Sequence, residues 1–338
     1  MSALTLETIA KLAGVSRSTV SRVVRNHKSV RSEVREHVLQ VIDETGYQPN
    51  AAAQMLAGQR TNIIGLVIAE PASVIFNDRY YTQIIQGVAR ELNQQNQTLT
   101  LFLSHDKSEE PLLAKRLVQN QLIDGVIVCG TRTGDLFVPA LLNSTMPFVV
   151  IGPNENRQVN FIDIDSFSAS KEIVTHLIRL GRKRIGTIAG PKDHPAAISR
   201  LQGYKEALQE ADLLVDDRLI TIASYFTETM GYELTSSLIT QSVDAIFAAS
   251  DTLAFGAMRA IKEAGLLIPD NIAVVGFDDS AEAAMVQPAL TTIRQDIFAA
   301  STQSVRTLLE VIEHGHEPAK QIYLPTQLIV RESCGSLL

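Results

Sequence analysis

The chain has 338 residues, of which 45% are hydrophobic and 20% are charged, an ordinary balance for a globular protein of two or three domains. No apolar run reaches the roughly 18 residues needed to span a bilayer, and no apolar leader with a cleavage site opens the chain, so we expect a cytoplasmic protein. The two cysteines, Cys129 and Cys334, match no metal or redox spacing. We therefore expect no disulfide framework, no metal site and no cofactor.

Charge is unevenly distributed along the chain. Residues 1–60 hold eight Lys and Arg against five Asp and Glu, whereas residues 61–338 hold 22 against 32. A basic segment on an acidic body places contacts to nucleic-acid phosphates on the N-terminal segment alone.

Residues 5–24 predict two short helices around a tight turn. Gly14 ends the first helix, because glycine adopts a positive φ at little cost, and the hydroxyl of Ser16 caps the second. The buried positions recur at helical spacing: Leu6, Ile9, Ala10, Ala13, Val20, Val23 and Val24. The polar positions of the second helix face outward: Arg17, Ser18, Ser21 and Arg22. This pattern suits a helix that enters a DNA major groove, although an ordinary helical hairpin with a solvated face has the same periodicity.

A third helix is predicted from Ser32 to Gly46, with Val34, Val38, Val41 and Ile42 on one face. Three short helices of this kind make a minimal DNA-binding headpiece. Downstream, Pro49 and Asn50 break the helix. Residues 51–57 favour a helix, but one too short to be stable alone, so we expect it to fold when it docks on DNA.

From residue 62 onward, short apolar runs alternate with amphipathic stretches, which predicts parallel sheets covered by helices on both faces. The predicted strands are 63–69, 99–104, 126–130, 148–152, 161–165, 185–190, 219–223, 245–250 and 273–277. The clearest predicted helices are 81–93, 112–119, 168–180, 196–210 and 253–264. This is too many strands for one such sheet, so we expect two similar halves near 62–162 and 163–290. The pattern alone gives only a weak indication that 291–331 crosses between them.

Residues 5–60 closely resemble the headpiece and hinge of the LacI/GalR family of bacterial transcription regulators, through "VSRSTVSRVV", "VREHVLQVIDETGYQPN" and "AAAQMLAG". The resemblance continues to the C-terminus and implies that residues 291–331 cross between the two halves. It implies a helix-turn-helix headpiece (1–48), a hinge helix and linker (49–61), and an effector-binding and dimerisation domain (62–338). The implied fold class is α/β: two doubly wound parallel-sheet lobes, similar to type I periplasmic binding proteins, after a small all-α headpiece. Ligands of such sheets sit outside the carboxyl ends of the strands.

The resemblance also implies the residues that contact DNA. Arg17 and Ser18 occupy variable specificity positions, Arg22 matches a base-contacting arginine, and Leu56 matches a leucine that wedges into the minor groove. The remaining candidates position phosphates or belong to the hinge. The full set is Thr5, Ser16, Arg17, Ser18, Thr19, Ser21, Arg22, Asn26, Asn50, Ala53 and Leu56. Two alternatives stay open: Arg17 as a phosphate contact, and Leu56 packed on the body.

Effector contacts are implied in the same way at Tyr80, Tyr81, Asp163, Arg200, Phe226, Ser250, Asp251, Asp278 and Gln295. The aromatic residues would stack on a ring, Arg200 would bond ligand oxygens, and Asp278 would accept bonds from ligand hydroxyls. Ser250-Asp251 departs from the Asn-Asp of many relatives, which weakens residue 250 as a contact. Structural alternatives are a helix cap at Asp251 or Asp279, a core position for Tyr81, and partly exposed surface positions for Asp278 and Arg200.

These observations predict a sequence-specific DNA-binding transcription regulator, a repressor, whose operator affinity is switched by a small molecule in the cleft between the lobes. A sugar is the leading effector and a nucleobase corepressor the second; a phosphorylated sugar would require more positive charge. We expect a homodimer on a pseudo-palindromic operator, because the chain stops at Leu338 without room for the extra helix of tetrameric relatives. An enzyme is a rival reading, but nucleophile-elbow, P-loop, dinucleotide and metal motifs are missing. A solute-binding protein linked to transport is a second rival interpretation. The DNA-binding headpiece argues against it, because it would have no role in such a protein.

Overall fold

The computed structural model describes residues 4–24, 29–47, 60–120, 122–315 and 318–336. The chain divides into two compact units, residues 1–61 and residues 62–338, and each is described by itself.

The N-terminal unit contains the helices α1 (Leu6–Leu12), α2 (Arg17–Val24) and α3 (Ser32–Thr45). The Thr5 and Thr8 side chains cap α1 reciprocally, and Ser16 Oγ accepts a hydrogen bond from the backbone N–H of Thr19 (3.1 Å) at the start of α2, as predicted. Gly46 ends α3 with φ +63°, a left-handed conformation that favours glycine. The buried core of this unit is Ile9, Ala10, Ala13, Val20, Val23, Val38 and Tyr47.

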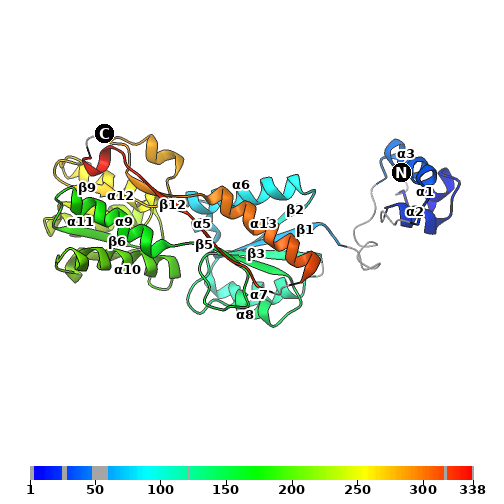
Figure 1. Cartoon of the computed structure of the whole chain (residues 1–338), viewed down its shortest axis with the longest axis horizontal. Coiled ribbons are helices and arrows are strands. Elements are labelled where there is room, and N and C mark those ends of the chain that lie inside the picture. The colour runs from blue at the N-terminus through cyan, green and yellow to red at the C-terminus, as the bar shows by residue number, and fades with distance from the viewer. Residues whose placement is uncertain (1–3, 25–28, 48–59, 121, 316–317, 337–338) are drawn as a thin grey trace. The chain divides into compact units, whose positions relative to one another are not determined.

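The second unit begins with a six-stranded parallel sheet, which forms the N-terminal lobe. Its strands, in the order in which they are hydrogen-bonded, are β11 (Gln321–Leu324), β5 (Phe161–Ile164), β4 (Phe148–Ile151), β3 (Gly125–Cys129), β1 (Ile63–Pro71) and β2 (Thr98–Ser104). Its helical elements are α5 (Ala72–Ile75), α6 (Arg79–Gln94), η1 (Lys107–Glu109), α7 (Glu110–Val118), α8 (Phe137–Leu142) and α13 (Ile297–His314). Helices α6 and α13 pack against each other, although they lie far apart in the sequence (Figure 1).

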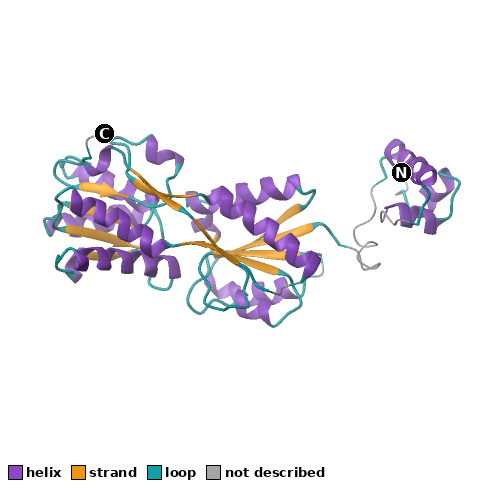
Figure 2. Cartoon of the chain, in the orientation of Figure 1, coloured by secondary structure: helices purple, strands orange, loops and turns teal. Residues whose placement is uncertain are grey.

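The C-terminal lobe is a four-stranded parallel sheet with helices on both faces (Figure 2). Its strands, in hydrogen-bonded order, are β7 (Ile220–Ile222), β6 (Ile185–Ala189), β8 (Ala245–Ala248) and β9 (Ala273–Val275). Its helical elements are α9 (Ser166–Arg179), α10 (Pro195–Glu210), η2 (Asp217–Leu219), α11 (Glu228–Thr240), α12 (Asp251–Glu263) and η3 (Ala281–Ala284). Ile246 packs with the helices α11 and α12, whereas its neighbour Phe247 packs with α9 and α10, because successive side chains of a strand point to opposite faces.

The chain crosses between the lobes three times. After β5 it enters the C-terminal lobe. It returns through β10 (Thr292–Gln295) to α13 and β11 in the N-terminal lobe, and crosses back through β12 (Thr326–Ile329) to η4 (Glu332–Cys334). Strands β10 and β12 pair antiparallel, Thr292 opposite Ile329, and Figure 1 shows β12 running between the lobes. The predicted crossing of residues 291–331 is therefore confirmed.

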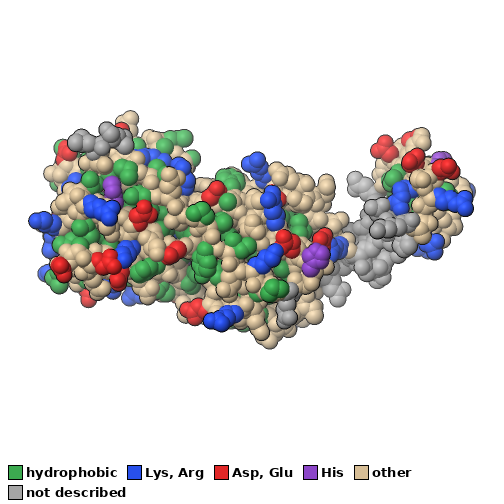
Figure 3. All heavy atoms as spheres, viewed as in Figure 1, with side chains coloured by type: hydrophobic (Ala, Val, Ile, Leu, Met, Phe, Trp, Pro, Cys, Tyr) green, Lys and Arg blue, Asp and Glu red, His purple; other side chains and the backbone are tan. Residues whose placement is uncertain are grey.

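The predicted fold class is confirmed: both main sheets are parallel and covered by helices, and each of the nine predicted strands and five predicted helices is present. On the face drawn in Figure 3, side chains of both charges are interspersed over the second unit. Among the described residues, no helix combines the length and the apolar character needed to cross a bilayer.

Candidate functional site

The exposed face of α2 presents basic and hydroxyl side chains. Arg17, Ser18 and Arg22 are exposed, while Val20 and Val23 are buried against α1 and α3. The Arg17 guanidinium lies 3.4 Å from the Glu7 carboxylate, and about two thirds of each side chain is accessible to solvent. Exposed ion pairs of this kind contribute little, so Arg17 can exchange its partner for a phosphate or a base edge.

The hydroxyl groups around the start of α2 are bonded to one another. Ser16 Oγ lies 2.8 Å from both Ser18 Oγ and Thr19 Oγ1, and Ser21 is half-buried on the next turn. Thr5, another predicted DNA contact, caps α1. These contacts fix the helix ends, while a hydroxyl that accepts one bond can still donate another. The other predicted DNA contacts, Asn26, Asn50, Ala53 and Leu56, lie outside the described residues.

A cavity lies between the two lobes of the second unit, and we call it the interlobe cavity. It encloses about 590 Å³ of atom-free space, counted with its opening to solvent. Its lining residues follow the carboxyl ends of strands in both sheets, as the topology of parallel sheets predicts. Eight of the nine predicted effector residues line it: Tyr80, Tyr81, Asp163, Arg200, Phe226, Ser250, Asp278 and Gln295.

Arg200 and Asp278 form the polar centre of the interlobe cavity. Arg200 Nη2 lies 3.6 Å from Asp278 Oδ1, which also accepts a hydrogen bond from Gln295 Nε2 (2.5 Å). Arg200 Nη1 donates to the Ala249 carbonyl (2.6 Å), and the guanidinium lies 3.7 Å from the centre of the Phe277 ring. Gln295 belongs to β10, so this network joins the cavity to a strand that crosses between the lobes.

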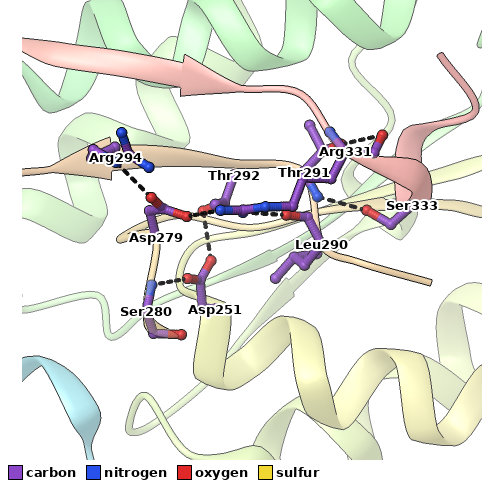
Figure 4. A network of polar contacts seen from close by, with 9 residues as sticks. All are labelled: Asp251, Asp279, Ser280, Leu290, Thr291, Thr292, Arg294, Arg331 and Ser333. Carbon is purple, nitrogen blue, oxygen red and sulfur yellow. Dashed lines mark hydrogen bonds and ion pairs between the residues drawn. The ribbon is translucent and has the colours of Figure 1, made fainter. Parts of the chain in front are cut away.

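The backbone at Asp278 and Asp279 adopts an unusual conformation. Their φ angles are +116° and +54°, and conformations of this kind cost energy that the surrounding contacts must offset. The Asp278 N–H donates to the Ile293 carbonyl (2.8 Å). The Asp279 carboxylate accepts from Arg294 Nε and Arg331 Nη2, both at 2.6 Å (Figure 4). The crossing strands thus hold Asp278 in the cavity wall.

Asp251, which is predicted as an effector contact, is not among the residues that line the interlobe cavity. Asp251 is 1% exposed, and its carboxylate accepts bonds from Thr292 Oγ1 (2.6 Å) and the Ser280 N–H (2.7 Å) (Figure 4). These contacts tie the first turn of α12 to β10 and to the segment after Asp279. The helix cap of α12 is Ser250, whose Oγ accepts from the Leu253 N–H (3.2 Å).

Aromatic rings line the cavity from both lobes. Tyr80 and Tyr81, in the first turn of α6, contact each other edge to face. Phe226 contacts the His194 ring in the same way. Gly190, which follows β6, leaves room for this ring, because a Cβ at that position would overlap Phe226.

Burial changes the protonation of the cavity carboxylates. It raises the pKa of Asp78, the N-cap of α6, to about 7. It also raises the pKa of Asp163 to about 7, against the stabilising charge of Arg200. Burial and the charges of Arg200 and Arg132 lower the pKa of His194 to about 3, so His194 is neutral at pH 7. The cavity therefore combines carboxyl groups with one buried guanidinium.

The sequence patterns did not indicate four of the polar residues that line the cavity: Asp78, Thr131, Ser166 and His194. Ser166 Oγ, His194 Nδ1 and Arg200 Nε are buried without a hydrogen-bond partner among the residues that the structure describes. A buried polar atom without a partner is costly, so a polar ligand that pairs with these atoms gains affinity. Helix-cap patterns were the available signal for Asp78; nothing in the sequence distinguished the other three.

Ion pairs connect the lobes on the rim of the cavity. Asp193 of the C-terminal lobe lies 2.5 Å from Arg132 Nη1 and 3.1 Å from Lys107 Nζ of the N-terminal lobe. Arg132 is also paired with the buried Glu70 (2.6 Å). In a second contact, Arg79 lies 2.7 Å from Glu282. These pairs stabilise the present arrangement of the lobes.

No group of three or more His, Cys, Asp or Glu side chains among the described residues is arranged to hold a metal ion. The second unit thus offers a polar and aromatic cavity between two lobes, and the first offers a basic helix on a three-helix core. Together they have the features of a regulator that binds DNA and responds to a small molecule.

Comparisons with known proteins agree. Residues 5–50 match the family of bacterial regulatory proteins of the lacI type, and residues 174–334 match a periplasmic binding protein-like domain. The HTH-type transcriptional regulator CelR of Thermobifida fusca is 35% identical over 97% of this chain and 98% of its own. The chain belongs to the LacI family of bacterial transcriptional regulators, and it is a regulator rather than an enzyme.

Two solved structures are similar over nearly the whole length. A CelR–cellobiose complex has a TM-score of 0.76 and 34% identity, and covers 98% of this chain and 99% of its own. A lac repressor dimer bound to operator and the anti-inducer ONPF has a TM-score of 0.84 and 26% identity, with the same coverage.

Proposed function

We propose that this protein is a repressor whose affinity for its operator is switched by a neutral sugar bound in the interlobe cavity. The observation that carries the proposal is the polar network in that cavity, in which Asp278 contacts both Arg200 and Gln295. A buried guanidinium and a carboxylate offer a donor and an acceptor to adjacent hydroxyls, with aromatic rings on either side. The relative solved with cellobiose supports a sugar as the class of ligand.

The charges of the cavity favour a neutral ligand. Asp78, Asp163 and Asp278 line it with Arg200 as the buried cation. Even with the pKa of Asp78 and of Asp163 raised to about 7, a phosphate group would meet no excess of positive charge. His194 is neutral at pH 7 and adds none. A nucleobase is the second candidate, because the same rings and hydrogen-bonding groups accept a flat heterocycle.

For DNA, we propose that α2 lies in the major groove with Arg17, Ser18 and Arg22 at base edges or phosphates. The DNA phosphate backbone would be held by Ser16, Thr19, Ser21 and Thr5. Leu56 would open the minor groove at the operator centre. A homodimer formed through residues 62–338 would bring two headpieces to a pseudo-palindromic site. The operator-bound lac repressor dimer supports this arrangement by likeness.

A thermal-shift panel of neutral sugars, sugar phosphates and nucleobases tests the ligand class. A ligand that binds the folded state raises the melting temperature. We expect stabilisation by a neutral sugar, lost in Arg200→Ala. Stabilisation by a nucleobase alone would replace the sugar by the second candidate, and stabilisation by sugar phosphates alone would contradict the charge argument.

Light scattering and an operator titration test the DNA-bound form. We expect a dimer at micromolar concentration, and Leu56→Ala should weaken operator binding while binding to random DNA changes little. A stable monomer, or unchanged operator affinity in Leu56→Ala, would contradict the dimer or the wedge respectively.

A further inference from the structure

A second hollow, which we call the outer groove, lies beside the interlobe cavity. Residues of α5 and the start of α6 line it from the N-terminal lobe, and the segments around the starts of α11 and α12 line it from the C-terminal lobe. It encloses about 1520 Å³ of atom-free space open to solvent. Asp78 lines both hollows, so at this point the wall between them is one residue thick.

The two hollows adjoin in the C-terminal lobe as well. Phe226 lines the interlobe cavity while its neighbour Tyr225 lines the outer groove, and Ser250 and Thr252 divide in the same way. Consecutive Cα atoms are 3.8 Å apart, so at Tyr225 and Phe226 adjacent residues again form the wall between the two hollows.

The groove is lined mainly by neutral polar and aromatic side chains. The polar ones are Ser73, Asn77, Thr82, Thr227, Thr229 and Thr252. Phe76 contributes an aromatic ring that is 59% exposed. A large exposed aromatic residue beside hydroxyl and amide groups suits a ring with one apolar face and a polar edge, which is the chemistry of a sugar ring.

The charged residues of the groove have charged partners or are buried. Arg79 lies 2.7 Å from Glu282, and Glu228 lies 2.9 Å from Arg259. Asp78 is 4% exposed and accepts a bond from the Tyr80 N–H (2.9 Å). A strongly charged ligand would have to break these contacts, so the groove suits a neutral ligand.

We propose that the outer groove is a second carbohydrate subsite and that the effector is an oligosaccharide of two or more rings. One ring occupies the interlobe cavity, and the following rings lie in the groove against Phe76. The proposal rests on the sugar-binding function proposed above and sharpens it, because the groove selects chain length.

Calorimetric titration of the full chain with sugars of one to four hexose rings, in α- and β-linked series of glucose, galactose and mannose, tests this. In the series that binds, affinity should rise from one ring to two or three. Phe76→Ala should remove about three- to tenfold of the affinity for the longer sugars and leave the single-ring affinity unchanged. Thr229→Trp, which fills the groove at an exposed position, should have the same selective effect.

One control variant and the dependence on sugar length separate the possible failures. Phe298→Ala removes another exposed aromatic ring, which lies on α13 and is not among the residues that line the groove. It should leave affinity at all lengths unchanged. Affinity independent of length, or equal losses at all lengths in Phe76→Ala, would overturn the groove and leave the cavity proposal standing. Failure of every sugar at every length would contradict the proposed function, and the subsite with it.

Discussion

The recognition helix and the interlobe cavity use side chains in opposite ways. The functional candidates of α2 lie within two turns of one helix, and Arg17 and Arg22 are exposed to solvent. Those of the cavity come from several helices, strands and loops of both lobes, and Arg200 is buried between Asp278, the Ala249 carbonyl and the Phe277 ring. Exposed charges adapt to a long polyanion, whereas buried charges are held in place and select one small ligand.

The largest effect should follow from removing the buried cation. Arg200→Ala leaves Asp278 and Asp163 without their opposite charge in a buried site, so we expect a loss of effector affinity of about a hundredfold or more, with a lower melting temperature. Operator affinity without effector should stay within about twofold, since the α2 contacts are unchanged. Calorimetry with the identified effector and an operator titration measure both. Wild-type effector affinity would show that the pocket lies elsewhere.

The corresponding change in the recognition helix should spare stability. Arg17→Ala removes an exposed side chain, and we expect it to cost ~1–3 kcal/mol on the preferred operator and to relax base preference at one position per half-site. Titration against all single-base variants of the operator measures the pattern. An equal loss on every variant would make Arg17 a phosphate anchor. Glu7→Ala, which removes the ion-pair partner of Arg17, is the matched control and should change affinity little.

Breaking the ion pairs between the lobes should have a smaller effect. Asp193→Ala removes the partner that Arg132 and Lys107 share across the cavity rim, while the pair of Arg132 with Glu70 remains. We expect effector affinity to fall by about three- to tenfold, in the range of partly exposed ion pairs. Glu210→Ala breaks an ion pair with Lys171 within the C-terminal lobe and should leave affinity unchanged. Equal effects of the two changes would argue against a role for the interlobe pairs.

The last prediction concerns the dependence of stability on pH. The folded protein holds the pKa of Asp78 near 7, above its ordinary value of 3.8, so between these values the folded state binds more protons than the unfolded state. Ionised Asp78 therefore lowers stability as pH rises from about 4 to 7. Asp78→Asn keeps the helix-capping oxygen and removes this penalty. Its melting temperature should exceed that of the wild type at pH 8, and the difference should shrink by about half or more at pH 5. A difference independent of pH would contradict the assignment.

The sequence predicted the headpiece and the strands well because their signals are local. Gly46 and Ser16 mark helix ends through their own chemistry, and the apolar spacing of α1 to α3 reports their shared core directly. The parallel strands are short runs in which nearly every residue is apolar, so each strand can be recognised from its own residues. The crossing of residues 291–331 was expected chiefly by family resemblance, because no local signal says which sheet β11 joins.

The cavity was predictable only in part. Arg200, Asp278 and Gln295 are scattered along the chain, and the family resemblance alone indicated them together. Asp251 follows a strand of the same lobe, yet its carboxylate points into the network with Thr292 and Ser280. Ser166 and His194 reach the cavity through the packing of the two lobes. Which side of a loop faces a cavity depends on contacts between residues that are distant in the sequence. A single amino-acid sequence does not show which residues make such contacts.

The central claim is that a ligand in the interlobe cavity controls DNA binding by the headpiece. The most direct test is a titration of operator DNA with the wild-type chain and with Arg200→Ala, each with and without a saturating concentration of the sugar that stabilises the wild type most. A ligand shifts this equilibrium only if it binds the two states unequally. We predict that the sugar changes wild-type operator affinity by at least tenfold and leaves that of Arg200→Ala unchanged. Equal operator affinity of the wild type with and without the sugar would contradict the account.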